Sequence, residues 1–355
     1  MNKSIKYFIV SDVHSFYSVL KDTLNQKGFN KERGDVLVVN GDLFDRGEES
    51  VELFEFVKSL GDNFIYVRGN HEDLLSDCLY ELGLGKVPGR HHFSNGTIRT
   101  ISHFTGIEEH RFSWGLNAQE LAILQNKMEP VVSFIKEKCV NYFEIGPYII
   151  THCWIPCESK SYNYFGNTKF DNIWPKWNIP KEELENSDKF LSSQLWEQAR
   201  WGNPFEYWRQ KMVPDGRVIV SGHWHCSWGH SHIDQKRKEW PDKNRLDWLE
   251  SFDIWYRHNF IAIDGCVAYT KKLNCMVVEY DGKDLHNKTL HMKHYNGVVK
   301  PVPVLPNGIV RFSYDGKDCK HSVSRVDFYE LGYSVHTIGG NCLTYDKDFE
   351  VIKYV

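Results

Sequence analysis

The sequence predicts an α/β protein, and three observations carry this prediction. Short apolar runs typical of buried strands recur along the chain, amphipathic helical patterns lie between the first of them, and one strand–helix unit takes about 30 residues. The five runs with the composition of strands buried on both faces are 7–10, 36–39, 64–67, 148–151 and 218–220. The alternation predicts a right-handed βαβ core, in which ligands bind beyond the carboxyl ends of the strands.

The helices between the first three strands are predicted from apolar stripes. One stripe consists of Phe16, Val19, Leu20 and Leu24, and the other of Val51, Phe54, Val57 and Leu60. Steps of three and four residues place each set on one face of a helix.

Two long segments interrupt this core. Residues 84–146 include a predicted helix from about Ala118 to Cys139. Residues 154–215 are rich in Trp, Tyr and Pro and are expected to form an irregular lid or wall.

Strand character returns in the last quarter of the chain. The runs are 260–263, 276–279 and, with alternating character, those near 302–305 and 309–312. We predict a main domain over residues 1–295, with insertions at about 84–146 and 154–215, and a small β-rich appendage over residues 296–355.

Composition narrows the possible functions. The net charge of −4 gives no general attraction to nucleic acid or to anionic membranes, so neither is an expected partner. The chain starts without a signal-peptide pattern and has no run of apolar residues long enough to span a membrane. The nine scattered cysteines suggest reduced thiols in a cytoplasmic protein.

Residue types that bind metals follow each of the five predicted strands. They are Asp12, His14, Asp42, Asn70, His152, His223 and His225. Any one of them alone is more often structural, but buried strands that all lead into such residues are difficult to explain by packing. Carboxylate, amide and imidazole ligands together suit Mn, Fe or Zn better than Mg or Ca.

This set is large enough for two metal ions. Two ions about 3.5–4 Å apart share a carboxylate and activate water for phosphate chemistry. We assign Asp42 as the shared ligand and expect two divalent ions, with Mn preferred. One ion would be held by Asp12, His14, Asp42 and His225, and the other by Asp42, Asn70, His152 and His223.

The blocks that contain these residues resemble the signature of the calcineurin-like metallophosphoesterases. The blocks are Asp12-Val-His14, Gly41-Asp-Leu-Phe-Asp-Arg-Gly47, Gly69-Asn-His-Glu72, His152 and Gly222-His-Trp-His225. The second and third are most similar to the phosphoprotein phosphatase branch, which includes bacterial and phage Ser/Thr phosphatases. The blocks follow the family order over roughly residues 5–280. The resemblance implies a four-layer fold, a central β-sandwich flanked by helices, and a catalytic role for the main domain.

The resemblance also implies roles for neighbouring residues. His71 is similar to the general acid of the family and Asp45 to the carboxylate that orients it. Arg46 and Arg68 resemble the phosphate-binding arginines, and a planar guanidinium suits two phosphoryl oxygens. Arg200 loosely resembles a third arginine of this kind. The alternative is that Asp45 and Arg46 form a turn salt bridge and that Arg68 is a surface residue.

The chain departs from the eukaryotic protein phosphatases in two blocks. His152-Cys-Trp replaces His-Gly-Gly, and His225 adds a second histidine of the kind found in phosphodiesterase and nuclease relatives. Asp264-Gly-Cys resembles a block near the end of the family core, and we interpret it as structural.

The predicted function is hydrolysis of phosphomonoesters by attack of a metal-bound hydroxide, with phosphoserine or phosphothreonine protein as the favoured substrate. One alternative is hydrolysis of a dinucleoside polyphosphate or another phosphodiester. An alternative of another class is a binding scaffold that has lost catalysis, although the intact ligand set argues against it.

Overall fold

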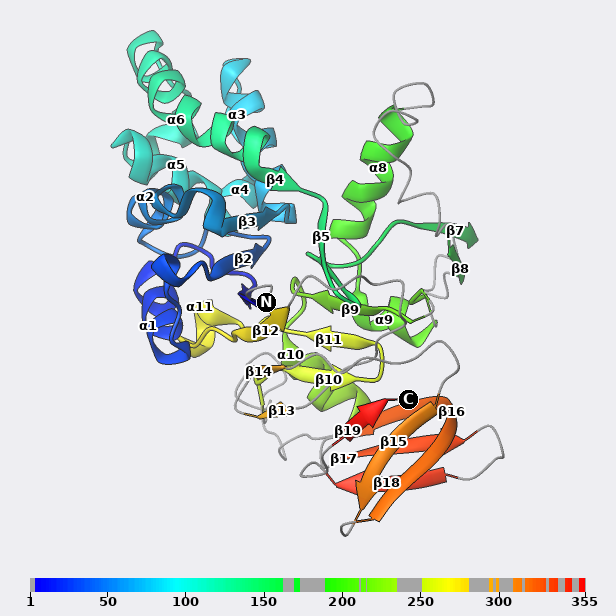
Figure 1. Cartoon of the computed structure of the whole chain (residues 1–355). Helices are drawn as coiled ribbons and strands as arrows, with labels where there is room; N and C mark the ends of the chain where they lie inside the picture. The colour runs from blue at the N-terminus through cyan, green and yellow to red at the C-terminus, as the bar shows by residue number, and fades with distance from the viewer. Residues whose placement is uncertain are drawn as a thin grey trace, which may run out of the picture.

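Two sheets form the centre of the molecule (Figure 1). The computed structural model describes residues 4–161, 169–172, 189–210, 212–214, 216–234 and 251–280, together with strands between residues 294 and 354. The first sheet has the order β13-β14-β12-β1-β2-β3-β4 and the second β10-β11-β9-β6-β5. Strands β1, β2 and β3 run parallel to one another, and so do β6, β9 and β11.

The strands of the first sheet are β1 (Ile5–Val10), β2 (Val36–Asn40), β3 (Phe64–Val67), β4 (Cys139–Val140), β12 (Met276–Tyr280), β13 (His294–Tyr295) and β14 (Val298–Val299). Those of the second are β5 (Tyr142–Ile145), β6 (Tyr148–Thr151), β9 (Val218–Ser221), β10 (Trp255–Arg257) and β11 (Phe260–Ala262). All five strands expected to carry ligands are therefore present.

The two sheets pack face to face, because their strands are apolar on both sides. Ile9, Val38 and Val67 of the first sheet share a buried cluster with Ile150 and Val220 of the second. Neighbouring residues in the same strands point the other way, since side chains alternate along a strand. This alternation explains why the sequence shows continuous apolar runs rather than a polar–apolar alternation.

Helices cover the outer face of the first sheet (Figure 1). They are α1 (Tyr17–Lys27), α2 (Ser50–Leu60), α3 (Asn70–Gly83), α4 (Arg90–Ser94), α5 (Thr97–Thr105) and α6 (Ala118–Lys138), with short 3-10 turns at Lys31–Arg33, Gly61–Asn63 and Glu109–Trp114. Both helices expected from apolar stripes are present, and α6 matches the helix expected in the first insertion.

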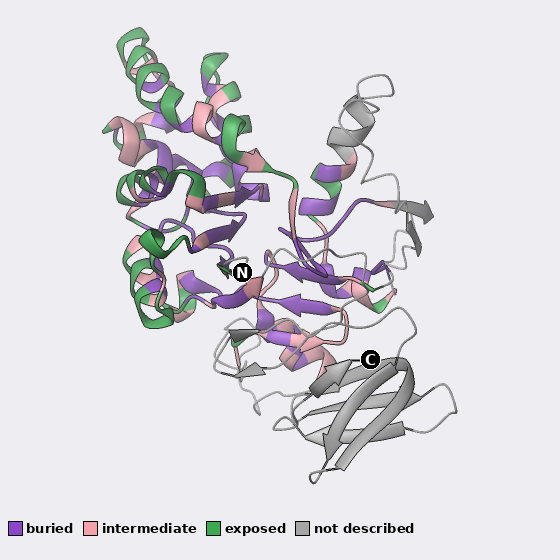
Figure 2. Ribbon diagram, in the orientation of Figure 1, coloured by how far each residue is buried: buried purple, intermediate pink, exposed green. Residues whose placement is uncertain are grey.

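The outer face of the second sheet carries an aromatic cluster that includes Trp154, Phe205, Trp255 and Phe260. Its covering elements include α9 (Pro204–Arg209) and α10 (Cys226–Trp228), which continues as a π-helical turn at Gly229–Ile233. The order helix, sheet, sheet, helix confirms the four-layer α/β fold, and burial is concentrated in the two sheets (Figure 2).

The second insertion is less irregular than expected. Its described residues form the hairpin β7 (Cys157–Ser161) and β8 (Lys169–Asn172) and two helices, α8 (Lys189–Arg200) and α9. Residues 162–168 and 173–188 lie outside the described part of the chain. A further short helix, α11 (Val267–Thr270), follows β11.

The C-terminal strands form a five-stranded antiparallel sheet of their own. They are β15 (Ile309–Tyr314), β16 (Lys317–Tyr329), β17 (Gly332–Thr337), β18 (Cys342–Asp346) and β19 (Val351–Tyr354). Strand β14, beyond the expected boundary at residue 295, pairs with β12 of the first sheet. The domain boundary remains a prediction, and the run expected near 302–305 lies outside the described residues.

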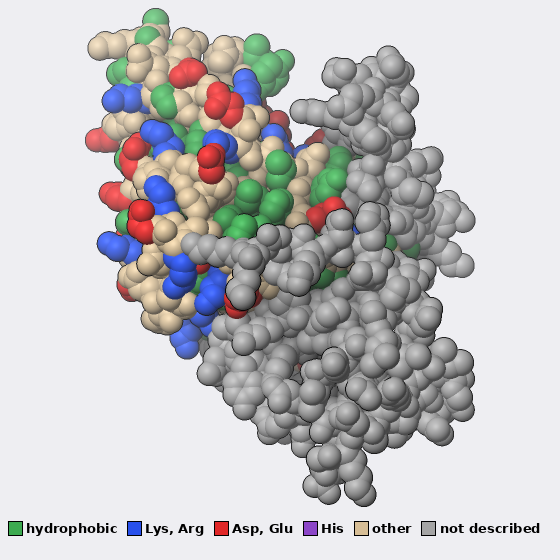
Figure 3. Space-filling model, viewed as in Figure 1, with side chains coloured by type: hydrophobic (Ala, Val, Ile, Leu, Met, Phe, Trp, Pro, Cys, Tyr) green, Lys and Arg blue, Asp and Glu red, His purple; other side chains and the backbone are tan. Residues whose placement is uncertain are grey.

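The surface shows no strong charge bias on the face in Figure 3, where acidic and basic side chains of the described residues are interspersed. No helix among the described residues is both long and apolar enough to cross a membrane.

Candidate metal centre

The carboxyl ends of parallel strands from both sheets meet at one edge of the sandwich. Asn40, at the end of β2, is fully buried and joins them. Its side-chain amide donates to the carbonyls of Thr151 in β6, at 2.9 Å, and Val220 in β9, at 3.4 Å. Its own carbonyl accepts from Ser11 Oγ at 2.9 Å and from His152 Nδ1 at 3.0 Å. The ends of four strands, β1, β2, β6 and β9, are thereby brought together.

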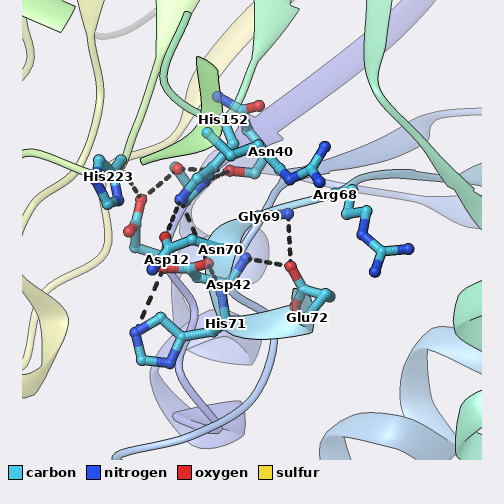
Figure 4. Close-up of polar contacts among 12 residues, drawn as sticks. Asp12, Asn40, Asp42, Arg68, Gly69, Asn70, His71, Glu72, His152 and His223 are labelled. Carbon is cyan, nitrogen blue, oxygen red and sulfur yellow. Dashed lines mark hydrogen bonds and ion pairs between the residues drawn. The ribbon is translucent and has the colours of Figure 1, made fainter. Parts of the chain in front are cut away.

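Asp42 lies at the centre of this convergence (Figure 4). Its Oδ1 is 3.3 Å from His152 Nε2, and its Oδ2 is 3.7 Å from His14 Nε2. The described residues contain two groups of possible ligands, His14, Asp42 and His71 in one and Asp42, His152 and His223 in the other, and within each group the ligand atoms all lie within 4.8 Å of one another. Asp42 belongs to both groups and turns one oxygen towards each, as a shared ligand requires.

Asp12 and Asn70 lie beside these two groups, one at each. Asp12 Oδ1 is 3.9 Å from His14 Nε2, and Asn70 Oδ1 is 2.8 Å from His152 Nε2. Asp12 Oδ2 also accepts from the backbone N–H of His223 at 3.0 Å.

His225 lies outside both groups. Its Nε2 is 4.0 Å from Asp264 Oδ2, and 31% of its side chain is exposed. Conversely, the first group includes His71, which the sequence did not predict as a metal ligand. The role of His225 as a ligand remains a prediction.

Several candidate residues have backbone conformations that are rare outside glycine. The φ angles of Asp12, His14, Asp42 and His223 are 54°, 50°, 53° and 66°. Such conformations cost energy and persist where the surroundings fix them, most often at functional sites. Here the N–H of His14 donates to the carbonyl of Asp42 at 2.9 Å, so the two strained loops hold each other.

Glycines give the ligand atoms their space. A Cβ on Gly69 would lie 2.2 Å from Asp42 Oδ1, one on Gly41 2.2 Å from His152 Nδ1, and one on Gly222 2.3 Å from Asp12 Oδ2. The donor set and this close packing fit a metal centre, which Asp12, His14, Asp42, Asn70, His152 and His223 would form.

Glu72 is a residue of this site that sequence reasoning did not single out. Its buried carboxylate accepts from the backbone N–H groups of Asp42 at 3.1 Å, Leu43 at 3.0 Å and Gly69 at 2.6 Å, and from Tyr66 Oη at 2.6 Å. Burial, with the Glu72 charge, raises the pKa of Tyr66 well above its usual value, so the phenol remains a donor. The signal was the position of Glu72 three residues after Gly69, typical of a carboxylate that binds back to a helix start.

The electrostatics of the site favour a bound cation. Burial, with neighbouring carboxylates, raises the pKa of Asp12 and raises that of Asp42 well above its usual value. Burial also lowers the pKa values of His14 and His223 well below the usual range, so these imidazoles are neutral. Neutral imidazoles are the form that binds metals, and a cation between the crowded carboxylates would favour their ionised form.

His71 and Asp45 form a buried pair at the edge of the site. His71 Nδ1 lies 2.7 Å from Asp45 Oδ2, whereas its Nε2 faces Asp42 Oδ2 at 3.9 Å and Arg46 Nη2 at 3.3 Å. Burial acts to lower the pKa of His71, but the charges of Asp42 and Asp45 outweigh it, and the pKa is raised. The pair therefore has the geometry expected of an oriented general acid.

Arg68 and Arg200 meet at one carboxylate. Arg68 Nε donates to Asp73 Oδ1 at 2.7 Å, and Arg200 Nε donates to Asp73 Oδ2 at 2.7 Å. Asp73 lies one helical turn after Asn70, on the same face of α3. Two guanidinium groups on one carboxylate leave a positive charge next to the ligands, although phosphate binding by these arginines remains a prediction.

Comparison with known proteins identifies the family. The family model described as calcineurin-like phosphoesterase matches residues 5–254. The chain belongs to this family. This family depends on two metal ions, and the His and Asp groups around Asp42 could hold such ions.

Individual relatives match less of the chain. A symmetrical bis(5'-nucleosyl)-tetraphosphatase of Proteus mirabilis is 43% identical over 65 residues, which are 18% of this chain and 23% of the relative. Its counterpart in Wigglesworthia glossinidia brevipalpis is 26% identical over 195 residues, 50% of this chain and 63% of the relative. The chain thus spans less than two thirds of these curated relatives. A cold-active protein-tyrosine phosphatase from a Shewanella species has a similar structure, with a TM-score of 0.39 and 16% identity over 85% of this chain and 82% of that one.

The shared position of Asp42 predicts the metal content of a variant. Wild-type protein should bind about two ions per chain, and Asp42→Asn should lose metal from both sites because one residue serves both. Metal analysis after exhaustive dialysis measures this, with Asp77→Asn, an exposed carboxylate on α3, as the matched control. Loss of a single ion in Asp42→Asn, with the other site still full, would contradict a bridging role.

The raised pKa values of Asp12 and Asp42 predict how metal binding depends on pH. A metal binds the ionised carboxylates, so below the raised pKa values it must displace protons. Mn²⁺ binding to metal-free protein should release most protons at mildly acidic pH and fewer as the pH rises. His14 and His223 should add little, because their pKa values are lowered. Calorimetric titration in buffers of different ionisation enthalpy measures the release, and a pH-independent value would contradict the prediction.

Proposed function

We propose that this chain hydrolyses phosphate monoesters with the help of two divalent metal ions, Mn²⁺ being the expected pair. The observation that carries the proposal is Asp42, whose two oxygens face two separate groups of ligand atoms. When bound, the ions would neutralise the ester and lower the pKa of water.

The chain's own residues would position the ester and handle the proton of the leaving group. His71 donates its Nδ1–H to Asp45, which leaves Nε2 facing the centre. Arg46 places a guanidinium beside that nitrogen, where it can bind phosphoryl oxygens. Protonated His71 can then give its Nε2 proton to the departing alkoxide.

Phosphoserine or phosphothreonine protein is the substrate class that we propose first. It is supported by the complete Gly41–Gly47 and Gly69–Glu72 blocks, which resemble the phosphoprotein phosphatases. Arg68 and Arg200 add positive charge one helical turn from Asn70, which suits a dianionic monoester. The unpaired thiols of the described cysteines support a cytoplasmic location for this activity.

Symmetrical hydrolysis of a dinucleoside tetraphosphate is a second candidate. It is supported by the names of the curated relatives and by Trp201, whose indole is 45% exposed and lies 6.3 Å, edge to face, from the His223 ring. An exposed indole next to a ligand offers a face on which a nucleobase can stack.

A panel of substrates distinguishes these functions. Metal-reconstituted protein should hydrolyse p-nitrophenyl phosphate and a phosphoserine peptide faster than bis(p-nitrophenyl) phosphate or diadenosine tetraphosphate. Faster turnover of the tetraphosphate would favour the second candidate. If protein with a verified full metal content hydrolysed none of them, a binding scaffold without catalysis would be supported.

The role of His71 predicts a dependence on the leaving group. An alkoxide must be protonated as it departs, whereas a nitrophenolate leaves nearly unaided. His71→Asn should therefore lower kcat by about 10²–10⁴-fold on a phosphoserine peptide and much less on p-nitrophenyl phosphate. Metal analysis of the same variant is the control, because His71 also lies within reach of the first group of ligands. Equal losses on both esters, or loss of an ion, would give His71 a different role.

A further inference from the structure

Helix α5, in the first insertion, reaches the His71–Asp45 pair. The side chains of Thr97 and Thr100 are buried and take up both oxygens of Asp45. Thr97 Oγ1 donates to Oδ2 at 2.9 Å, and Thr100 Oγ1 donates to Oδ1 at 2.8 Å. The N–H of Asp45 donates in turn to Thr100 Oγ1 at 3.0 Å. Asp45 is therefore fixed by three hydrogen bonds besides the one it accepts from His71.

The same helix start also holds the strained turn that carries Asp45 and Arg46. Asp45 and Arg46 have φ angles of 75° and 62°. Gly96, at φ 89°, packs so closely that a Cβ would lie 2.4 Å from the Arg46 backbone nitrogen. Arg99 Nη1 donates to Glu48 at 3.0 Å on the far side of this turn. The start of α5 thus holds this turn both by backbone packing and by hydrogen bonds. The same turn carries the Asp45 carboxylate and the Arg46 guanidinium.

We propose that Thr97 and Thr100 are positioning residues for the general acid. They hold the Asp45 carboxylate in the one orientation that accepts the Nδ1–H of His71, so that Nε2 stays directed at the leaving oxygen. Without these two donors the Asp45 carboxylate can rotate about its Cβ–Cγ bond, and the imidazole of His71 then loses its fixed orientation. This inference rests on the proposed function and assigns a catalytic purpose to an insertion that sequence reasoning treated only as an interruption of the core.

Kinetics of threonine variants test the proposal. Thr97→Val and Thr100→Val, alone and combined, keep the side-chain shape and remove the hydroxyl. The double variant should lose about 10-fold or more in kcat on a phosphoserine peptide, a part of the full acid contribution, with KM and metal content unchanged. The loss on p-nitrophenyl phosphate should be much smaller. The double serine variant, Thr97→Ser with Thr100→Ser, restores the hydroxyls and should restore kcat.

Two controls separate positioning from general loosening of the fold. Thr105, at the other end of α5, donates to the Ile101 carbonyl at 2.7 Å, so Thr105→Val should leave both rates unchanged. In an Asp45→Asn background the valine substitutions should add little, because residues that act through one group are not additive. Full additivity in that background, or equal losses on both esters, would overturn the proposal.

Proton NMR of metal-free protein tests the positioning role of the threonines independently of the proposed phosphatase activity. The Nδ1–H of His71, bound to a buried carboxylate, should give a low-field proton signal that is absent in His71→Asn. The double valine variant should lose or shift this signal while its circular dichroism stays that of the wild type. An unchanged signal would overturn the positioning role. If the wild type hydrolysed no ester but showed the threonine-dependent signal, only the proposed function would fail.

Discussion

The side-chain amide of Asn40 links the two sheets by hydrogen bonds, and the arrangement of the site depends on this link. It bonds to backbone carbonyls 111 and 180 residues away along the chain, in β6 and β9. A buried amide N–H left without partners costs about 1–3 kcal/mol, so the two bonds from Asn40 Nδ2 favour the alignment of the sheets in which both carbonyls are within reach. Asp42 lies two residues after Asn40 in the chain, and the imidazole of His152 is hydrogen-bonded to the Asn40 backbone carbonyl. Together with the apolar cluster between the sheets, this contact helps to fix the offset between their edges, where the candidate ligands meet.

The loops that follow the strands at the site contain residues with strained, positive φ angles, and many hydrogen bonds offset this strain. Backbone conformations of this kind cost of the order of 1–3 kcal/mol each. Glu72 binds three backbone N–H groups from the loops after β2 and β3. On the opposite side, Thr97 and Thr100 bind Asp45. The site is therefore held from two directions, by Glu72 of α3 and by the two threonines of α5.

The departure from the family pattern after His152 has a structural explanation. Cys153 and Trp154 are fully buried, and Trp154 stacks on Tyr207 at 5.7 Å and meets Phe260 edge to face at 5.4 Å. The indole of Trp154 thus packs the segment that follows His152 into the aromatic cluster of the second sheet. The candidate metal centre and the aromatic core of the second sheet are in this way in direct connection along the chain.

The sequence by itself determined the five buried strands, the polar residues after them and helix α6, because periodicity and strand ends are local properties of the chain. It also predicted Asp42 as the shared ligand, since two neighbouring ions need one bridging carboxylate. Other features depended on contacts between distant segments: the division of the strands between two sheets, the position of His225 beside Asp264, the meeting of Arg68 and Arg200 at Asp73, and the threonines that hold Asp45. Thr97 and Thr100 lie 52 and 55 residues from Asp45 in a helix whose local pattern is that of ordinary packing. Only the tertiary structure decides such pairs, because a hydrogen bond depends on where two segments meet and not on the residue types around either of them.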